Sequence, residues 1–271
     1  MPVYRTESGV RGEMAELIAE LSDVEALILD LDRTIYSNDE PIPGAVETVR
    51  ALKALHIPLR FLTNTTSRGR APLAAKLREL GFPVATEEVF GPPWAAGEFL
   101  RARGASAHLL IPDGAREDFD GVAIDDQHPD YVVLGDLGYD WTFGRLNHAF
   151  RLLLEEGAQL IGLGRSRYWR APDGLRLDTG PFVAALEYAT GRPATIIGKP
   201  ERTLYEMVLQ DLKLPADCVA MVGDDVEMDV RGAQRVGLRG VLVRTGKFRN
   251  GDLARGVWPS LVLDSVANLL R

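Results

Sequence analysis

The 271-residue sequence predicts an α/β protein, with a doubly wound parallel sheet as its core and a second α/β domain inserted into that core. The first apolar run, at residues 26–29, shows no alternation, which is typical of a strand covered on both faces in a parallel sheet. Three later apolar runs have the same form, and each stops at polar residues. Between Thr63 and Lys199 lies far more chain than a crossover between parallel strands needs, so we expect an inserted domain there.

The chain before the first strand predicts a short amphipathic helix over residues 12–21, where apolar side chains recur at helical spacing. The strand is expected at 26–30, and Asp30 and Asp32 lie at its end. Two residues apart in an extended chain, these side chains project to the same side. Ligands of parallel sheets bind beyond the carboxyl ends of strands, so both carboxylates are candidates for one site.

The later strand ends strengthen this interpretation, because a lone Asp-x-Asp is more often a turn or a helix cap. Together they add carboxylates, a hydroxyl and an amine. The runs at 59–62, 194–197 and 219–222 are followed by Thr63, Asn64 and Thr65, by Gly198, Lys199 and Pro200, and by Gly223, Asp224 and Asp225, with Asp229 beyond.

The inserted domain is expected at residues 82–187, which leaves 1–81 and 188–271 for the core. Its own pattern is α/β. Tyr168 and Trp169 either complete the core of this small domain or line a substrate pocket. The domain's apolar runs lie at 107–111, 131–134 and 159–163, and an amphipathic helix is expected near 143–156.

The residue types at the strand ends suit transfer of a phosphoryl group to an aspartate. A carboxylate nucleophile needs no deprotonation at pH 7, but a divalent cation has to neutralise its repulsion with phosphate. Mg²⁺ prefers oxygen ligands, which Asp30, Asp224 and a backbone carbonyl can supply. The Thr63 hydroxyl, the amides around Asn64 and the Lys199 ammonium can bind the transferring oxygens.

Asp32 is left as the general acid and base, a role that typically contributes about 100-fold to 10,000-fold in rate. The sequence therefore predicts Mg²⁺-dependent hydrolysis of small phosphomonoesters through an aspartyl phosphate. Two alternatives remain, a receiver-type signalling domain and a weakly active phosphate-binding protein of the same fold. A carboxylate beside the nucleophile and the size of the insertion oppose the signalling alternative.

The motifs resemble, in order and spacing, those of the haloacid dehalogenase (HAD) superfamily, and within it the class IIA, NagD-like branch of nitrophenylphosphatase-like proteins. The resemblance runs from Leu27 to Phe248. The four motifs are matched by Asp30, Asp32 and Thr34, by Thr63 and Asn64, by Lys199 within Gly-Lys-Pro, and by Gly223, Asp224 and Asp229.

This resemblance implies a HAD-like, Rossmannoid core and a cap domain that covers the site and selects the substrate, with segments 91–93 and 178–181 at its boundary or rim. The implied catalytic residues are Asp30 as nucleophile, Asp32 as acid and base, Thr63 and Lys199. The implied substrate-binding residues are Asn64 and Thr65. The implied Mg²⁺ ligands are Asp30, the backbone of Asp32, and Asp224, supported by Asp229.

Arg33 departs from the family, which usually has glycine after the second aspartate. Arginine resists the backbone angles that glycine permits. In one interpretation Arg33 keeps an ordinary negative φ and points to solvent. In another it adds positive charge at the entrance and captures an anionic leaving group. Reduced activity is the third alternative.

The formal net charge of −8 and the pI near 5.2 argue against a nucleic-acid or anionic-membrane surface. The N-terminus lacks a signal-peptide pattern, no apolar run approaches the roughly 20 residues of a membrane span, and the single Cys218 cannot form an internal disulfide. We therefore expect a cytoplasmic protein that acts on a small phosphorylated metabolite, without nucleic-acid or membrane partners. A homodimer remains an open alternative.

Overall fold

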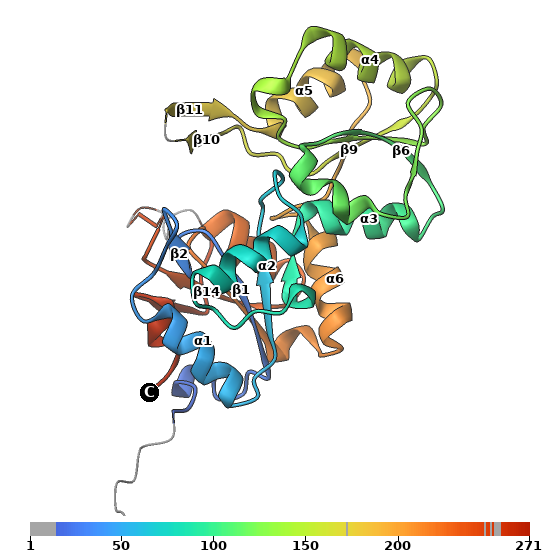
Figure 1. Ribbon diagram of the computed structural model, residues 1–271. Helices are drawn as coiled ribbons and strands as arrows, with labels where there is room; N and C mark the ends of the chain where they lie inside the picture. The colour runs from blue at the N-terminus through green and yellow to red at the C-terminus, as the bar shows by residue number, and fades with distance from the viewer. Residues whose placement is uncertain (1–14, 172, 247, 250, 252–255) are drawn as a thin grey trace, which may run out of the picture.

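The computed structural model describes residues 15–171, 173–246, 248–249, 251 and 256–271, which form two α/β lobes (Figure 1). The lower lobe in Figure 1 is the core, and its six-stranded sheet is parallel throughout. Its strands are β1 (Ala26–Asp30), β4 (Leu59–Leu62), β5 (Val89–Phe90), β13 (Val219–Gly223), β14 (Arg239–Val243) and β15 (Leu261–Leu263), in the spatial order β15-β14-β13-β1-β4-β5.

Helices cover both faces of this sheet. Because side chains alternate along a strand, Leu27 and Leu29 of β1 join one apolar cluster and Ala26 and Ile28 join another. The first cluster includes side chains of α1 (Ala45–Ala54) and α2 (Arg70–Glu79), and the second those of α6 (Arg202–Leu212). The run 26–29 is thus buried on both faces, and the expected doubly wound core is confirmed.

The central strand β1 lies at the point where the strand order reverses. From β1 the chain continues to β4 and β5 on one side, and after the insertion it returns to β13 and β14 on the other. Sheets of this kind bind ligands beyond the carboxyl ends of the strands at such a reversal. The topology therefore directs attention to the residues that follow β1, β4 and β13.

The upper lobe is built on a second parallel sheet, in the order β12-β9-β8-β6-β7. Apolar side chains from α4 and α5 cover one face of this sheet, and those from α3 and a 3₁₀ segment, η3, cover the other. The elements are α3 (Pro92–Arg101), β6 (Ser106–Leu110), η3 (Asp113–Phe119), β7 (Ala123–Ile124), β8 (Tyr131–Leu134), α4 (Phe143–Leu154), β9 (Gln159–Gly162), α5 (Thr179–Thr190) and β12 (Thr195–Ile196).

Each lobe also carries a small two-stranded hairpin. The hairpin of β10 (Tyr168–Ala171) and β11 (Gly174–Leu177) projects from the upper lobe, and β2 (Tyr36–Ser37) pairs with β3 (Glu40–Pro41) in the core. None of the described helices is long and apolar enough to cross a membrane. The remaining short elements are η1 (Ala19–Leu21), η2 (Thr86–Glu88), η4 (Gly138–Asp140), η5 (Ala216–Cys218), the π-helix η6 (Val226–Arg231), α7 (Gly232–Gln234) and η8 (Val266–Leu269).

The sheet pairing differs from the sequence prediction at two short strands. β5 lies within the expected insertion, 82–187, but pairs with β4 of the core. β12 lies within the expected core but pairs with β9 of the second sheet. The prediction that the run at 194–197 ends at the core sheet is therefore wrong. Strands of two residues are too short for an apolar pattern to reveal their partner.

The expected helix at 12–21 is wrong in the part that the structure describes, and residues 12–14 lie outside the described residues. Leu17 forms an isolated antiparallel bridge with Leu270, and only Ala19–Leu21 is helical, as a 3₁₀ turn. Pairing with the distant C-terminal segment outweighs the local helical pattern, because such short helices are marginal by themselves.

The inserted lobe contacts the core through the start of α2, whose N-cap residue Gly69 has no capping side chain. Instead, the Asp118 carboxylate of η3 accepts the Arg70 N–H at 3.1 Å, and Glu117 Oε1 accepts the Ala71 N–H at 3.1 Å. A Cβ on Gly69 would come within 3.0 Å of Glu117 Oε1 and 3.1 Å of Asp118 Oδ2. Glycine thus permits two carboxylates to cap the positive end of a core helix.

Burial raises the pKa of Asp118 to about 6, from 3.8. A carboxyl with a raised folded-state pKa stabilises the fold most when protonated, and this contribution is lost as the pH rises through about 6. Asp118→Asn keeps an oxygen acceptor but removes the buried charge. We therefore expect its melting temperature, relative to wild type, to increase between about pH 4 and about pH 8 in thermal unfolding. The exposed Asp120→Asn is the control, and a parallel pH profile of the two variants would contradict this role of Asp118.

Candidate active site

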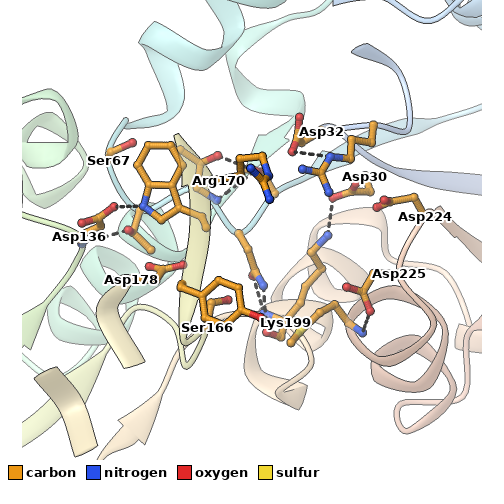
Figure 2. Close-up of a pocket in the computed structure, with 18 of the residues that line it drawn as sticks. Asp30, Asp32, Ser67, Asp136, Ser166, Arg170, Asp178, Lys199, Asp224 and Asp225 are labelled. Carbon is orange, nitrogen blue, oxygen red and sulfur yellow. Dashed lines mark hydrogen bonds and ion pairs between the residues drawn. The ribbon is translucent and has the colours of Figure 1, made fainter. Parts of the chain in front are cut away.

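The carboxyl end of the core sheet faces the hairpin β10–β11 across a pocket of about 540 Å³ (Figure 2). This volume lies within the range of small-molecule sites, roughly 300–1,000 Å³. The lining includes every residue that the sequence predicted for the site, namely Asp30, Asp32, Thr63, Asn64, Thr65, Lys199, Asp224 and Asp229.

The buried side chain of Lys199 lies at the centre of these site residues. Its Nζ donates to Asp30 Oδ1 at 2.5 Å and to Asp229 Oδ1 at 2.6 Å. The other Asp30 oxygen accepts the Thr34 hydroxyl at 3.0 Å. Asp30 is thereby held in one orientation at the end of β1, with its carboxylate at the floor of the pocket.

Negative charge exceeds positive charge at this floor. Ligand oxygens of Asp30, Asp224 and Asp229 lie within 4.8 Å of one another, and all three residues are buried. Burial opposes the charge of Lys199, but the Asp229 and Asp30 carboxylates hold its pKa well above the usual value. Burial raises the pKa of Asp229 to about 7, although the Lys199 charge lowers it. One ammonium beside three carboxylates leaves an oxygen-rich site suited to a divalent cation.

The two aspartates of the first motif occupy different environments. The Asp30 side chain is 9% exposed, whereas the Asp32 side chain is 61% exposed at the pocket mouth. The Asp32 carboxylate lies 3.8 Å from the Arg33 Nε. A buried, fixed carboxylate suits attack on phosphorus, and a solvent-accessible one suits proton exchange with a leaving group and water.

Asn64 connects the second motif to the third. Its Oδ1 accepts the Lys199 N–H at 2.7 Å, and its Nδ2 donates to the Lys199 carbonyl at 3.0 Å. The side chain of Asn64 therefore fixes the backbone of Lys199, a contact that the sequence prediction of a substrate-binding residue did not include. Thr63 Oγ1 accepts the Thr65 N–H at 3.1 Å and lies 3.0 Å from Thr65 Oγ1, which shapes the loop after β4.

Asp229 reaches the floor because Gly223 has no side chain. A Cβ at Gly223 would come within 2.2 Å of Asp229 Oδ2. That oxygen accepts the Asp225 N–H at 3.0 Å, so both Asp229 oxygens are engaged by N–H donors. The Asp225 carboxylate in turn accepts the N–H groups of Glu227 and Met228 at the start of η6.

Arg33 adopts φ 64°, in the left-handed region. The interpretation with a negative φ and a solvent-directed side chain is therefore wrong, because the side chain lines the pocket and is only 35% exposed. A non-glycine residue in this region costs roughly 1–2 kcal/mol. Positive charge at the site entrance, the second interpretation, agrees with this placement.

The inserted lobe supplies pocket residues that the sequence prediction missed. Asp136 and Ser166 follow strands β8 and β9, so the rule used for the core would also have found them in the insertion. Tyr168 and Trp169 line the pocket, 57% and 39% exposed, as one of their two interpretations predicted. The further lining residues are Ser67 and Thr66 of the core loop, Arg170, Leu175 and Asp178 of the inserted lobe, and Asp225 and Met228 of the core.

Comparison with known proteins identifies the family. A model described as haloacid dehalogenase-like hydrolase matches residues 27–125, and one described as HAD-hydrolase-like matches residues 196–269. Phospholysine phosphohistidine inorganic pyrophosphate phosphatase of Bos taurus is 41% identical over 244 residues, 88% of this chain and 90% of that protein. The chain is a member of the haloacid dehalogenase-like hydrolases.

Two solved structures of phosphatases agree with this assignment. The 4-nitrophenylphosphatase of Thermotoga maritima superposes with a TM-score of 0.86 at 31% identity, over 93% of this chain and 98% of that one. Glycerol phosphate phosphatase of Mycobacterium tuberculosis, in a complex with magnesium, gives 0.83 at 26% identity, over 94% and 78%. The chain thus belongs to the class IIA, NagD-like branch and is a HAD-like phosphatase.

The Asn64 clamp on Lys199 predicts a measurable stability effect. Asn64→Ala leaves the Lys199 N–H and carbonyl without these partners, which should reduce the free energy of unfolding by about 1–3 kcal/mol in urea titrations. Asn147→Ala on α4 is the control and should change it by no more than about 0.5 kcal/mol. Equal stability of the two variants would show that the clamp is dispensable.

Proposed function

We propose that the chain is a Mg²⁺-dependent phosphatase that hydrolyses small phosphomonoesters through an aspartyl phosphate on Asp30. The observation that supports this most is the Asp30 carboxylate, which is fixed by Lys199 and Thr34 and lies within ligand distance of Asp224 and Asp229. A nucleophile at the end of the central strand and an oxygen-rich cation site next to it are the two requirements of this chemistry.

Asp30, Asp224 and the backbone carbonyl of Asp32 are the ligands that we assign to Mg²⁺, with Asp229 as support. When bound, the cation would reduce the electrostatic repulsion between the phosphate and the carboxylates. Lys199 holds Asp30 in place through its ammonium. In our assignment the Thr63 and Thr65 hydroxyls and the backbone N–H of Asn64 bind the phosphate oxygens.

The reaction proceeds in two steps, formation and then hydrolysis of the aspartyl phosphate. An Asp30 oxygen forms a bond to phosphorus as the bond to the leaving oxygen breaks, and Asp32 gives its proton to that oxygen. Asp32 then accepts a proton from water, whose oxygen attacks the aspartyl phosphate and releases inorganic phosphate and the Asp30 carboxylate. The exposed position of Asp32 supports both exchanges.

The names of the structural relatives support a small ester as substrate. They are described as a 4-nitrophenylphosphatase and a glycerol phosphate phosphatase. We further assign the inserted lobe, expected at residues 82–187 and extended by β12, as a cap that selects the substrate, because side chains of the hairpin β10–β11 line the pocket. Such a cap would exclude phosphoproteins and nucleic acids. The proposed setting is the cytoplasm.

A weakly active phosphate-binding or signalling protein is the alternative. A signalling domain would keep its phosphate on Asp30 for minutes or longer, so the lifetime of the phosphoenzyme separates the two functions. A broad phosphatase screen with Mg²⁺ separates an active enzyme from a poorly active binding protein. Wild-type turnover of 4-nitrophenyl phosphate that chelation abolishes would favour the phosphatase.

Two substitutions test the roles of the motif aspartates. Asp30→Asn should remove essentially all turnover, because an amide is a poor nucleophile. Asp32→Asn should slow hydrolysis of an alkyl phosphate by about 100-fold to 10,000-fold, because only proton transfer is lost. Steady-state assays on proteins with wild-type circular dichroism provide the measurement. Turnover by folded Asp30→Asn would exclude the covalent mechanism, and wild-type rates in Asp32→Asn would exclude the acid/base role.

The different roles assigned to Asp224, a direct Mg²⁺ ligand, and Asp229, a support, predict different losses of Mg²⁺ affinity on substitution. Both Asp229 oxygens already accept N–H groups, so Asp229→Asn should weaken binding by only the roughly 10- to 100-fold of an outer-sphere partner. Asp224→Asn should weaken it further, because a direct ligand is lost. Isothermal titration with Mg²⁺ measures the affinity of the two variants, which are matched because each removes one negative charge. Equal losses would contradict the ranking of the two aspartates.

A further inference from the structure

We propose that Arg33 and Arg170 together bind a second anionic group on the leaving-group side of the substrate. The substrates of the pocket would then be small phosphate compounds whose leaving group carries a carboxylate or another phosphate. This inference rests on the proposed phosphatase function, which it deepens. Arg33 comes from the core loop after β1, and Arg170 comes from β10 of the inserted lobe, yet both line the same pocket.

The backbone of Arg33 is held in its strained conformation from both sides. Its N–H donates to the Tyr36 carbonyl at 2.5 Å, and its carbonyl accepts the Thr245 hydroxyl at 2.6 Å. Glycine would adopt φ 64° without strain, so the feature that distinguishes arginine here is its guanidinium in the pocket. Strained residues of this kind cluster at functional sites. The guanidinium lies beside Asp32, where the leaving oxygen receives its proton.

Arg170 is presented by an anchored hairpin. The indole of its neighbour Trp169 donates to Asp136 Oδ2 at 2.9 Å, and Arg176 and Tyr139 both donate to Asp173. Figure 2 draws Arg170 between Asp136 and Asp32. Among the residues that the structure describes, no hydrogen bond or ion pair engages the Arg170 guanidinium, which leaves its donors available to a ligand.

The two arginines, and not the net charge of a pocket that seven carboxylates also line, favour an anion over an apolar leaving group. Lys199 is occupied by Asp30 and Asp229, so the two arginines are the remaining cations among the lining residues. An apolar leaving group could contact Tyr168 and Trp169, but it would cover the Arg170 guanidinium without pairing it, which is unfavourable. Arg33 would keep only the Asp32 carboxylate at 3.8 Å. A carboxylate or phosphate would accept their paired N–H groups with the geometry that arginine suits best.

Binding of three phosphonates, in the presence of Mg²⁺, tests the inference without turnover. 3-Phosphonopropionate carries a carboxylate in addition to its phosphonate, methylenediphosphonate carries a second phosphonate, and 3-methylbutylphosphonate is the isostere of the first with an uncharged branched tail. We expect at least one of the two probes with a second anionic group to bind wild type about tenfold or more tightly than the isostere, as for charge-assisted hydrogen bonds. The probe with the larger preference identifies the second anion as carboxylate or phosphate.

Arg33→Gly and Arg170→Gln should each reduce this preference about tenfold in isothermal titrations. Arg33→Gly also relieves the backbone, so it should fold. Arg167 is exposed, lies just before the hairpin and is not among the residues that line the pocket. Arg167→Gln is therefore the control and should keep the wild-type preference for the probes with a second anionic group. Equal binding of the three probes to wild type, or an unchanged preference in either pocket variant, would overturn the inference.

Turnover separates failure of this inference from failure of the proposed function. If wild type hydrolyses 4-nitrophenyl phosphate while the three phosphonates bind equally, the phosphatase stands and the two-arginine subsite is wrong. If the phosphonate preference depends on both arginines but no phosphomonoester is hydrolysed, the subsite stands as a binding site and the proposed phosphatase function is wrong.

Discussion

The contact of the buried Lys199 ammonium with Asp30 and Asp229 is the interaction on which the rest of the site depends. Three buried carboxylates so close together repel one another. Lys199 is the only buried cation in the described part of the chain, and removing it would leave uncompensated charge at a cost of roughly 3–5 kcal/mol. The Asn64 clamp on the Lys199 backbone and the absence of a side chain at Gly223 both help to bring these groups together. The same crowding that requires an ammonium also makes a divalent cation favourable.

The two lobes meet so that the carboxyl ends of both parallel sheets face one pocket. The core contributes the residues after β1, β4 and β13, and the inserted lobe contributes those after β8 and β9. Their relative placement is supported by two carboxylates of η3 on the α2 N-terminus and by an apolar cluster that continues from the core through α3 into the second sheet. Chemistry and selectivity can therefore reside in separate lobes and still act on one bound molecule.

Much of this arrangement could be predicted from the sequence, because apolar runs without alternation mark buried strands and polar residues after them mark the ligand edge. That reasoning placed all eight predicted site residues in one pocket. It failed where local pattern carries little information. The two-residue strand β12 takes its partner from the second sheet, Leu17 pairs with the distant Leu270, and Arg33 accepts a positive φ imposed by contacts with Tyr36 and Thr245. Each is decided by tertiary contacts that no short window of sequence contains.

The most direct test is identification of the phosphorylated residue in the reacting protein. Asp32→Asn protein, mixed with Mg²⁺ and a substrate that has a good leaving group, such as 4-nitrophenyl phosphate, would be quenched in acid, digested and analysed by mass spectrometry. We expect a phosphate adduct on the carboxylate of Asp30, because loss of the base should slow hydrolysis of the aspartyl phosphate. Burst release of nitrophenol with an adduct on another residue, or steady turnover with no adduct on the Asp30 peptide at any quench time, would contradict Asp30 as the nucleophile.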